Sequence, residues 1–474
     1  MNQHDLAIKI LTNLPYEPNE QQMQVALALA RFCIPQPGPS ADRVFVLNGY
    51  AGTGKTSLTG ALVKALRASH IETVLLAPTG RAAKVFGSYA GMAASTIHRR
   101  IYRHSLTGNA GHPGMRENRS SHTVFIVDEA SMIGNDDEQG SFLLRDLIQY
   151  VFSGTDCRLI MLGDTAQLPP VGSTMSPAMD PDTLRSYGLK VTRATITDVA
   201  RQAADSGILR NATRLRRAQS LPQTDSPMPV PVVTDGYDDV ALVTPDELPD
   251  MIDSAYRSDG PGETVVITRS NLTATQFNQA IRSIVLDREE ELVPGDLFVA
   301  AKNNYYWTRR KKEIDFIANG EVLELRSVIA SESRYGLRFA DVTMGLPERD
   351  DVEFDTKIIL DCLTGSAAAL DRDNYNRLYQ GIYEDPQIMP PGAPHEQRIK
   401  LLRESPYWNA LQVKYAYAVT CHKAQGGQWR NVFVDLSYVP PEQMGREFFR
   451  WLYTAVTRAR SRLYLINPPD AMLE

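Results

Sequence analysis

Short apolar runs, separated by polar and turn-forming residues, punctuate the first half of the chain. Four of them are rich in Val, Ile, Leu and Phe, and they lie at 44–47, 73–77, 124–127 and 158–162. Apolar runs of this length without polar alternation are typical of strands that are buried on both faces of a parallel sheet. We therefore predict that these four segments are strands of one sheet.

A helical pattern lies between the first two runs. Its apolar residues recur at i, i+3, i+4, i+7 and i+8, and they are Leu58, Ala61, Leu62, Ala65 and Leu66. A strand, a glycine-rich loop, a helix and a second strand make a βαβ unit. Residues 1–218 are therefore predicted to form one doubly wound α/β domain, with 103–122 as a polar excursion between strands.

The second half also shows the sequence pattern of an α/β lobe, but a segment with a different pattern interrupts it. A proline-rich stretch at 221–231 marks a boundary. Three further apolar runs beyond it are predicted strands, at 264–268, 432–436 and 462–466. Residues 290–410 instead show short strands with glycine turns, which favour a small β-barrel insert. We expect 219–289 and 411–474 to form a second α/β lobe around it, and we assign no structure to 366–406.

The composition narrows the class of protein. The chain has 474 residues, 43% of them hydrophobic, and a formal charge of -6 from 50 Lys and Arg against 56 Asp and Glu. Any contact with nucleic acid must therefore come from a local basic groove. There is no stretch of ~20 apolar residues, so we expect no membrane insertion and a cytoplasmic location. The four cysteines, Cys33, Cys157, Cys362 and Cys421, are scattered, which predicts buried, reduced thiols and no zinc site.

The stretch from Gly49 to Ser57, GYAGTGKTS, has the phosphate-binding P-loop spacing. Its glycines let backbone N–H groups turn toward phosphate oxygens, Lys55 supplies charge to the β- and γ-phosphates, and the Thr56 hydroxyl suits Mg²⁺. The nucleotide-binding residues of this loop are Gly49, Ala51, Gly52, Thr53, Gly54, Lys55, Thr56 and Ser57. The loop alone does not distinguish a kinase from a motor.

Acidic and amide groups follow two other predicted strands. Asp128 stands where a carboxylate would hold Mg²⁺, and Glu129 can polarise a water for attack on the γ-phosphate. This pair favours hydrolysis over phosphoryl transfer to a small molecule. Gln167 follows the next strand and can sense the γ-phosphate. From the second half, Arg458 or Arg460 could reach the same phosphate as an arginine finger, and Arg201 lies at the edge of the first domain.

The ordered motifs resemble those of superfamily 1B DNA helicases of the RecD and Dda type. The matching segments are PNEQQMQVA at 18–26, GYAGTGKTS at 49–57, APTGRAAKVF at 77–86, ASTIHRRIY at 94–102, VDEASM at 127–132, GDTAQLPPVG at 163–172, DVARQ at 198–202, VTCHKAQGGQW at 419–429 and YTAVTRARSRLYL at 453–465. The resemblance places the adenine contact on Gln22, with Gln21 as a competitor. It places the two arginine fingers on Arg201 and Arg458.

The resemblance also implies a fold and a task. It implies two RecA-like lobes with ATP and Mg²⁺ between them, an SH3-like barrel at 290–410 and a duplex-splitting pin at 103–122. It implies movement 5′ to 3′ on single-stranded DNA and unwinding of 5′-tailed duplex DNA, and we expect the chain to act as a monomer. The residues that this assigns to DNA contact are Pro78, Thr79, Arg81, Thr96, His98, Thr420, His422 and Lys423.

Some alternatives stay open at this stage. The chain could be a translocase subunit that unwinds only within a larger complex, or a remodelling ATPase that ignores DNA. The segment at 303–315 joins three aromatic residues to four consecutive cations. It could stack on bases, although a barrel core beside a solvated basic loop is the favoured interpretation. The pin segment carries no aromatic residue between Arg103 and His122.

Overall fold

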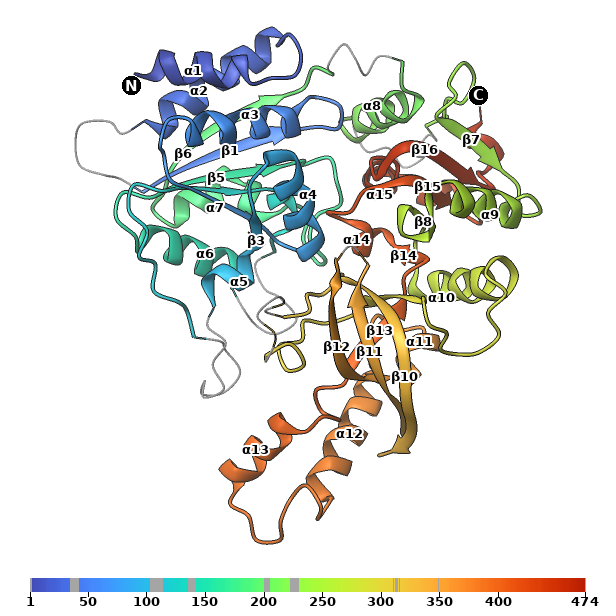
Figure 1. The fold of residues 1–474 in the computed structure, drawn as a ribbon. Coiled ribbons are helices and arrows are strands. Elements are labelled where there is room, and N and C mark those ends of the chain that lie inside the picture. Colours follow the sequence, from blue (N-terminus) through green and yellow to red (C-terminus); the bar gives the residue numbers. More distant parts are fainter. Residues whose placement is uncertain are drawn as a thin grey trace.

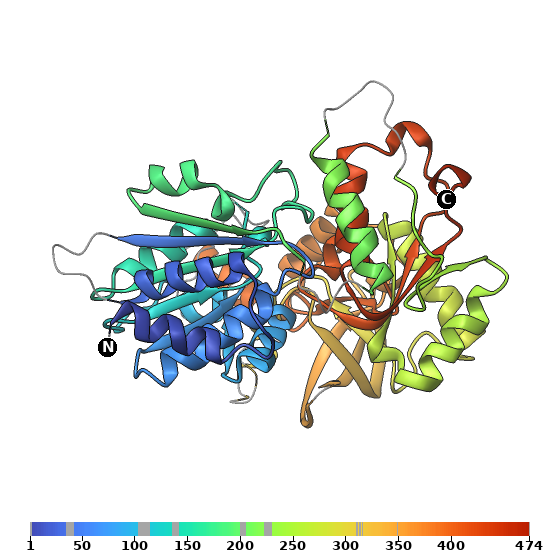
Figure 2. The same ribbon diagram turned by 90° about the horizontal axis from the view of Figure 1, so that it is seen from above.

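Two α/β lobes lie side by side, and a barrel with a helical insert extends from the second lobe (Figures 1 and 2). A computed structural model describes residues 2–34, 42–102, 114–134, 142–199, 205–221, 230–309, 311, 314, 316–347 and 349–473. All structural statements below concern these residues.

The first lobe is built on six parallel strands in the order β3-β2-β4-β5-β1-β6. Their bounds are β1 Arg43–Gly49, β2 Thr73–Ala77, β3 Ala94–Thr96, β4 Val124–Val127, β5 Arg158–Gly163 and β6 Lys190–Ile196. The four predicted strands are confirmed. The two edge strands were missed because β3 has three residues and β6 is mostly polar, so neither shows a buried apolar run.

Helices cover both faces of this sheet. One face carries α1 Gln3–Thr12, α2 Glu20–Cys33, α3 Lys55–Arg67 and α4 Gly80–Ala90. The other carries α5 Ile97–Ile101, α6 Leu143–Phe152 and α7 Pro181–Ser186, with the 3₁₀ helices η1 Ala130–Met132 and η2 Pro177–Met179. Neighbouring strand residues Val44 and Phe45 face opposite cores, as expected for a doubly covered parallel sheet.

The second lobe has five parallel strands in the order β14-β8-β15-β16-β7. Their bounds are β7 Val240–Val243, β8 Thr264–Thr268, β14 Ala418–Thr420, β15 Trp429–Asp435 and β16 Ala459–Ile466. One face packs on α8 Gly207–Gln219, α14 Cys421–Ala424 and α15 Arg446–Val456. The other packs on α9 Leu248–Asp259, α10 Asn271–Ala280, the following π-helical turn Ile281–Val285 and the barrel.

The core of the second lobe begins earlier than the expected boundary at 218. Ile208, Ala212 and Leu215 of α8 pack with α15 and the second sheet. An amphipathic pattern shows that a helix has an apolar face, but it does not show which sheet covers that face. The assignment of all residues up to 218 to the first lobe therefore needs this correction.

A closed barrel confirms the predicted β insert. Its strands follow the order β10-β11-β12-β13-β9, with bounds β9 Leu297–Ala300, β10 Val322–Arg334, β11 Leu337–Leu346, β12 Arg349–Ile359 and β13 Leu411–Tyr415. β13 lies beyond the expected end of the insert at 410, because the chain returns to the barrel after the helices α11 Asp361–Thr364, α12 Arg372–Glu384 and α13 His395–Glu404. The unassigned stretch 366–406 is thus largely the projecting helical pair of Figure 1.

The pin prediction falls partly outside the described residues, which omit 103–113. Residues 114–122 return along the first lobe, where Met115 forms an antiparallel bridge with Tyr102 and Ser121 bridges Thr155. The pin therefore stays a prediction.

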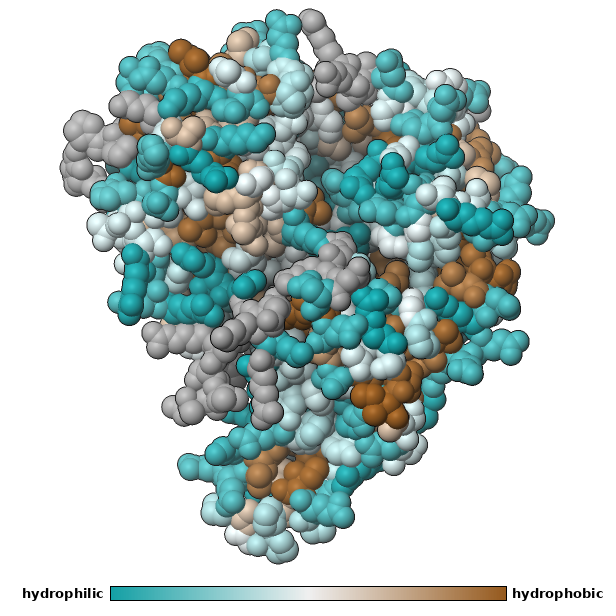
Figure 3. Space-filling model, viewed as in Figure 1, coloured by the Kyte–Doolittle hydropathy of each residue, from teal (hydrophilic) through white to brown (hydrophobic). Residues whose placement is uncertain are grey.

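The viewed face of the molecule is mostly hydrophilic, with separate apolar patches over the barrel and the helical pair (Figure 3). Among the described helices, none combines the length and apolar character needed to cross a membrane. All four cysteines are free and buried, as predicted. The described residues also contain no group of three or more His, Cys, Asp or Glu side chains arranged to hold a metal ion.

Candidate nucleotide site between the lobes

The glycine-rich loop connects β1 to α3 and depends on backbone that only glycine adopts easily. Gly52 and Gly54 have φ values of 73° and 79°. A Cβ on Gly54 would lie 2.1 Å from the Tyr16 hydroxyl, and one on Gly52 would lie 3.0 Å from Leu209. The loop is therefore enclosed on one side by the segment that leads into α2 and on another by α8.

Both candidate adenine-contacting glutamines are engaged with the protein. The Gln22 side chain is buried, accepts from Asn19 N at 3.1 Å and donates to the Thr53 carbonyl at 2.9 Å. Gln21 donates to Thr197 Oγ1 at 2.9 Å and accepts from Thr197 N at 2.9 Å. Gln22 thus braces the loop itself, and the adenine contact stays a prediction.

The two carboxylates lie directly after β4, at the carboxyl edge of the sheet. Asp128 Oδ1 is 4.0 Å from Lys55 Nζ and accepts from Glu129 N at 2.8 Å. Its other oxygen accepts a 2.5 Å hydrogen bond from the Tyr89 hydroxyl on α4. Asp128 is therefore fixed from two sides beside the lysine of the loop.

Glu129 has the geometry of a residue held for function. It adopts the left-handed backbone, with φ of 52°, which is uncommon for a residue with a side chain. Its Oε2 is buried and has no hydrogen-bond partner among the described residues. Burial raises the pKa of Glu129, while the charges of Lys55 and Arg458 lower it. The oxygen is thus available to a group that the protein does not supply.

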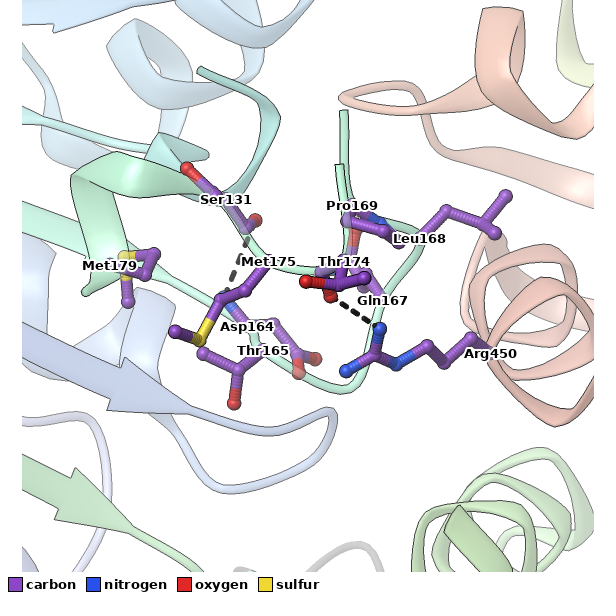
Figure 4. Close-up of a pocket in the computed structure, with 11 residues that line it drawn as sticks. Ser131, Asp164, Thr165, Gln167, Leu168, Pro169, Thr174, Met175, Met179 and Arg450 are labelled. Carbon is purple, nitrogen blue, oxygen red and sulfur yellow. Dashed lines mark hydrogen bonds between the residues drawn. The ribbon is translucent and has the colours of Figure 1, made fainter. Parts of the chain in front are cut away.

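Gln167 lies on the loop after β5 and lines a small cavity with Asp164, Met179 and Arg450 (Figure 4). Its Oε1 is buried without a partner in the described part of the chain. Across this cavity, Arg450 of α15 donates to the Thr174 carbonyl at 2.7 Å. The amide therefore stands where the first lobe meets the second.

The opposite wall of the site comes from α15 and the turn after it. Arg458 is buried, and its guanidinium donates to the carbonyls of Thr454 at 3.0 Å and Gly427 at 3.3 Å. Its charge lowers the pKa of Glu129 and of Asp164, so it lies within electrostatic range of both carboxyl groups. Arg460 instead pairs with Glu263. Arg201 lies outside the described residues and stays a prediction.

These residues fit Mg²⁺ and a nucleoside triphosphate. The loop opens a helix N-terminus, which favours phosphate, and Lys55 adds a cation. Thr56 is exposed at the start of α3, and Asp128 stands beside Lys55, so a hydroxyl and a carboxylate are available as metal ligands. The buried oxygens of Glu129 and Gln167 lack donors within the described chain. A water molecule could donate to either oxygen.

Three threonines predicted to contact DNA sit at equivalent places in the fold. Thr79, Thr96 and Thr420 each lie at or just after the end of a parallel strand and are the N-caps of α4, α5 and α14 respectively. The hydroxyls of Thr79 and Thr96 accept from Ala82 N and Arg99 N, each at 3.2 Å. Pro78 immediately precedes Thr79. These residues therefore share the carboxyl edges of the two sheets.

The remaining DNA candidates make contacts within the protein. Arg81 stacks over Trp429 at 3.7 Å and donates to the Gln428 carbonyl at 3.3 Å, so it links the lobes. Lys423 contacts Asn319 of the barrel. The His98 ring packs 5.6 Å from that of Tyr102, and burial lowers the pKa of His422. Their contact with DNA stays a prediction.

The aromatic residues at 305–307 pack on the insert. Trp307 Nε1 donates to the Asn409 carbonyl at 2.7 Å, and Tyr305 stacks on Phe316 with ring centroids 4.8 Å apart. The described residues thus favour the barrel interpretation over base stacking. Residues 310, 312, 313 and 315 lie outside them.

Comparison with known proteins shows which protein families this chain resembles. A family model described as "AAA domain" matches residues 34–224, and one described as "UvrD-like helicase C-terminal domain" matches 415–466. The ATP-dependent RecD2 DNA helicase of Deinococcus radiodurans is 26% identical over an alignment of 448 residues that covers 91% of this chain. The chain is thus similar to ATP-dependent DNA helicases of the RecD2 type over most of its length.

Other known proteins are also similar to this chain. The ATP-dependent DNA helicase dda of Enterobacteria phage T4 is 32% identical over 133 residues, 26% of this chain and 28% of the phage protein. A structure titled "Structural Basis for DNA Unwinding at Forked dsDNA by two coordinating Pif1 helicases" aligns with a TM-score of 0.47 at 14% identity, over 97% of this chain and 94% of that one. The chain spans 48% of the length of the Deinococcus relative.

Sequence reasoning missed three residues of the candidate nucleotide site. Tyr89 holds Asp128, Tyr453 reaches the glycine-rich loop from α15, and Asp164 receives the Tyr453 hydroxyl. Both tyrosines sit in amphipathic helices, where an aromatic residue usually fills a core. Only Asp164, which follows a buried strand like Asp128 does, carried a signal that could have been used.

Proposed function

We propose that this chain is an ATP-driven motor that moves 5′ to 3′ along single-stranded DNA and unwinds duplex DNA with a 5′ tail. The observation that carries the proposal is the seam between the lobes. The first lobe contributes Lys55, Asp128 and Glu129 to this seam. The second lobe contributes Arg458, and the charge of Arg458 lowers the pKa of Glu129. The names of the Deinococcus and T4 relatives, both ATP-dependent DNA helicases, support it.

The chemistry follows from the groups at the seam. Mg²⁺, when bound, would neutralise phosphate charge and orient the γ-phosphate. Thr56 and Asp128 would hold it, and Lys55 would contact the β- and γ-phosphates. Glu129 would take the proton of the attacking water, because its buried oxygen has no other partner among the described residues. Gln167 would respond to the γ-phosphate.

Movement requires that ATP changes how the lobes hold DNA. Arg458, and Arg201 from the segment outside the described residues, would gain contact with the γ-phosphate when the lobes close and lose it after hydrolysis. The carboxyl edges bearing Thr79, Thr96 and Thr420 would meet the DNA backbone. If closure changes the spacing of these edges, each cycle moves the strand one way.

The proposal also covers assembly and compartment. We propose that the chain acts as a monomer on single-stranded DNA and on 5′-tailed duplexes. The cytoplasm is the proposed location, and four free, buried thiols support a reducing compartment.

The deciding experiment measures ATP hydrolysis with and without single-stranded DNA, and then unwinding of 5′-tailed and 3′-tailed duplexes. We expect hydrolysis to rise with DNA and only the 5′-tailed duplex to open. Glu129→Gln should bind nucleotide and lose turnover by 10²-fold or more, on the order of a general base's contribution, whereas Lys55→Ala should lose both.

Other results assign the chain elsewhere. DNA-stimulated hydrolysis without unwinding of either duplex points to a translocase that needs a larger complex. Hydrolysis that ignores DNA points to a remodelling ATPase. Full turnover by Glu129→Gln removes Glu129 from the role of base.

A further inference from the structure

One buried hydroxyl joins the two lobes at the glycine-rich loop. Tyr453 lies on α15 of the second lobe and is 1% exposed. Its hydroxyl accepts a hydrogen bond from Ala51 N at 2.8 Å and donates one to Asp164 Oδ2 at 2.6 Å. Ala51 and Asp164 both belong to the first lobe. A single side chain therefore contacts the loop, the end of β5 and α15.

The next residue of α15 strengthens the same junction. Thr454 Oγ1 accepts from Leu168 N at 2.8 Å, one residue past Gln167. From the second lobe, Gln425 donates to the Leu168 carbonyl at 2.7 Å. Successive residues of α15 thus hold the segment that carries Gln167, and the helix cannot shift without breaking these bonds.

Tyr453 stands close to Arg458 along the chain. Their positions differ by five, and Tyr453 lies in the last turn of α15, which ends at Val456. Arg458 donates to the Thr454 carbonyl at 3.0 Å, and the Thr457 N–H donates to the Tyr453 carbonyl at 3.1 Å. A displacement of Tyr453 therefore reaches the guanidinium through one helical turn.

The hydroxyl also meets a buried charge. Burial raises the pKa of Asp164, and the charge of Lys55 and the Tyr453 hydrogen bond lower it. Without the hydroxyl, the Ala51 N–H and one Asp164 oxygen would each lose the partner described here, at a seam with little access to water. Both groups would then favour a different loop or lobe position.

We propose that Tyr453 is a positioning residue whose hydroxyl couples the glycine-rich loop and Asp164 to Arg458. This inference rests on the proposed ATPase function. A change at the loop would move α15, and α15 would place the arginine. Tyr453 itself would act on hydrolysis through Arg458.

The chain offers a matched control. Tyr417 is also 1% exposed, and its hydroxyl accepts from Leu297 N at 3.2 Å and donates to Asp296 Oδ1 at 3.0 Å; it also accepts from Arg288 at 2.8 Å. This arrangement of phenol, backbone N–H and buried carboxylate lies at the junction of the second lobe and the barrel. Tyr417→Phe therefore removes the same kinds of bond from a place away from the loop.

The experiment compares Tyr453→Phe, Tyr417→Phe, Arg458→Ala and the double variant Tyr453→Phe/Arg458→Ala. Thermal unfolding, kcat and KM for ATP are measured for each. We expect Tyr453→Phe to lower kcat about tenfold or more with KM within threefold. Tyr417→Phe should lower thermal stability similarly and leave kcat within twofold. In the Arg458→Ala background, Tyr453→Phe should change kcat less than twofold, because Tyr453 acts through Arg458.

Hydrogen exchange without nucleotide gives a readout independent of hydrolysis. Tyr453→Phe should speed exchange both at 50–54 and at 457–460, and Tyr417→Phe at neither. Faster exchange at 50–54 alone, an unchanged kcat, or effects of Tyr453→Phe and Arg458→Ala that multiply in full would each overturn the coupling. A wild-type chain that hydrolyses no ATP fails the proposed function instead, and the exchange pattern still decides the coupling.

Discussion

Tyr89 and Asp128 are joined by a 2.5 Å hydrogen bond from the phenol to Oδ2. Tyr89 lies near the end of α4, and Thr79 caps the start of the same helix. One helix therefore runs from a predicted DNA contact to the carboxylate predicted to hold Mg²⁺. Its length is about 15 Å at 1.5 Å per residue.

Removing the Tyr89 hydroxyl should weaken the metal site. In Tyr89→Phe the ring still packs on Phe86, but Asp128 loses one of the two groups that orient it. Loss of such an outer partner costs roughly 10- to 100-fold in metal affinity, so the Mg²⁺ concentration for half-maximal hydrolysis should rise about tenfold or more. A Mg²⁺ titration of the ATPase measures this shift.

Tyr102→Phe is the control for this change. Tyr102 is also buried and donates to a carboxylate, Asp146, at 2.8 Å, but on the opposite face of the sheet. It should leave the Mg²⁺ requirement unchanged. An equal shift in both variants would show that general loss of stability, and not the orientation of Asp128, sets the requirement.

Gln167 should link hydrolysis to DNA. Its buried Oε1 has no partner among the described residues, and the following residue is held by Thr454 and Gln425 of the second lobe. Gln167→Ala should bind an ATP analogue within about threefold of wild type, yet lose most of the DNA stimulation of hydrolysis, on the scale of one lost charge-assisted contact. Hydrolysis measured against increasing single-stranded DNA tests this.

Gln412→Ala provides the comparison, because Gln412 lies in β13 of the barrel, where its side chain accepts from Leu370 N at 3.0 Å. Normal DNA stimulation in Gln167→Ala would remove the residue from this role.

The sequence predicted the parts of the fold that depend on local pattern. Long apolar runs such as 158–162 became central strands, since continuous burial leaves an unmistakable signal. The position of the glycine-rich loop between β1 and α3 and that of Asp128 directly after β4 were predictable because both lie at fixed places after a strand, and their chemical roles stay predictions. The short edge strand Ala94–Thr96 lacked such a signal.

The contacts between the two lobes could not be predicted from the sequence. Tyr453 and Ala51 lie 402 positions apart, and no local pattern indicates that a helix tyrosine meets a loop N–H. The sharing of α8 with the second lobe was missed for the same reason. An apolar helix face fits any complementary sheet, and tertiary packing decides between them.

Glu321 of the barrel should make DNA binding depend on pH. It lies beside Gly80 at the start of α4, accepts from Ala318 N at 2.7 Å, and burial raises its pKa to about 6, against the opposing charge of Lys84. An acid with a raised pKa is neutral below about 6 and gains its negative charge as pH rises through that value. That charge would repel a DNA phosphate near α4.

Affinity for single-stranded DNA should therefore fall between pH 5 and 7. In Glu321→Gln, the part of this decrease that comes from ionisation of Glu321 should be absent. At pH 7.5 the variant should bind more tightly, by about fivefold for a repulsion of about 1 kcal/mol between charges near a surface. Fluorescence anisotropy at low salt measures both. Glu353→Gln removes a carboxylate from β12 of the same barrel and should change neither the pH dependence nor the DNA affinity at pH 7.5. If both variants behave alike, the effect comes from the net charge of the protein and not from the position of Glu321.

Arg458 and Arg460 make a natural pair for deciding which arginine completes the site. Arg458 is 3% exposed and lies within electrostatic range of Glu129, whereas Arg460 is more exposed and pairs with Glu263. Since a finger stabilises charge that develops only in the transition state, Arg458→Ala should lower kcat by about 10³-fold with KM for ATP within a few fold. Arg460→Ala loses only a surface ion pair, worth about 1 kcal/mol or less of stability, and should keep wild-type kcat. Steady-state ATPase on single-stranded DNA compares them directly. A larger loss in Arg460→Ala would mean that the turn after α15 rearranges when ATP binds, and that the contacts of Arg458 with Thr454 and Gly427 are those of a structural residue.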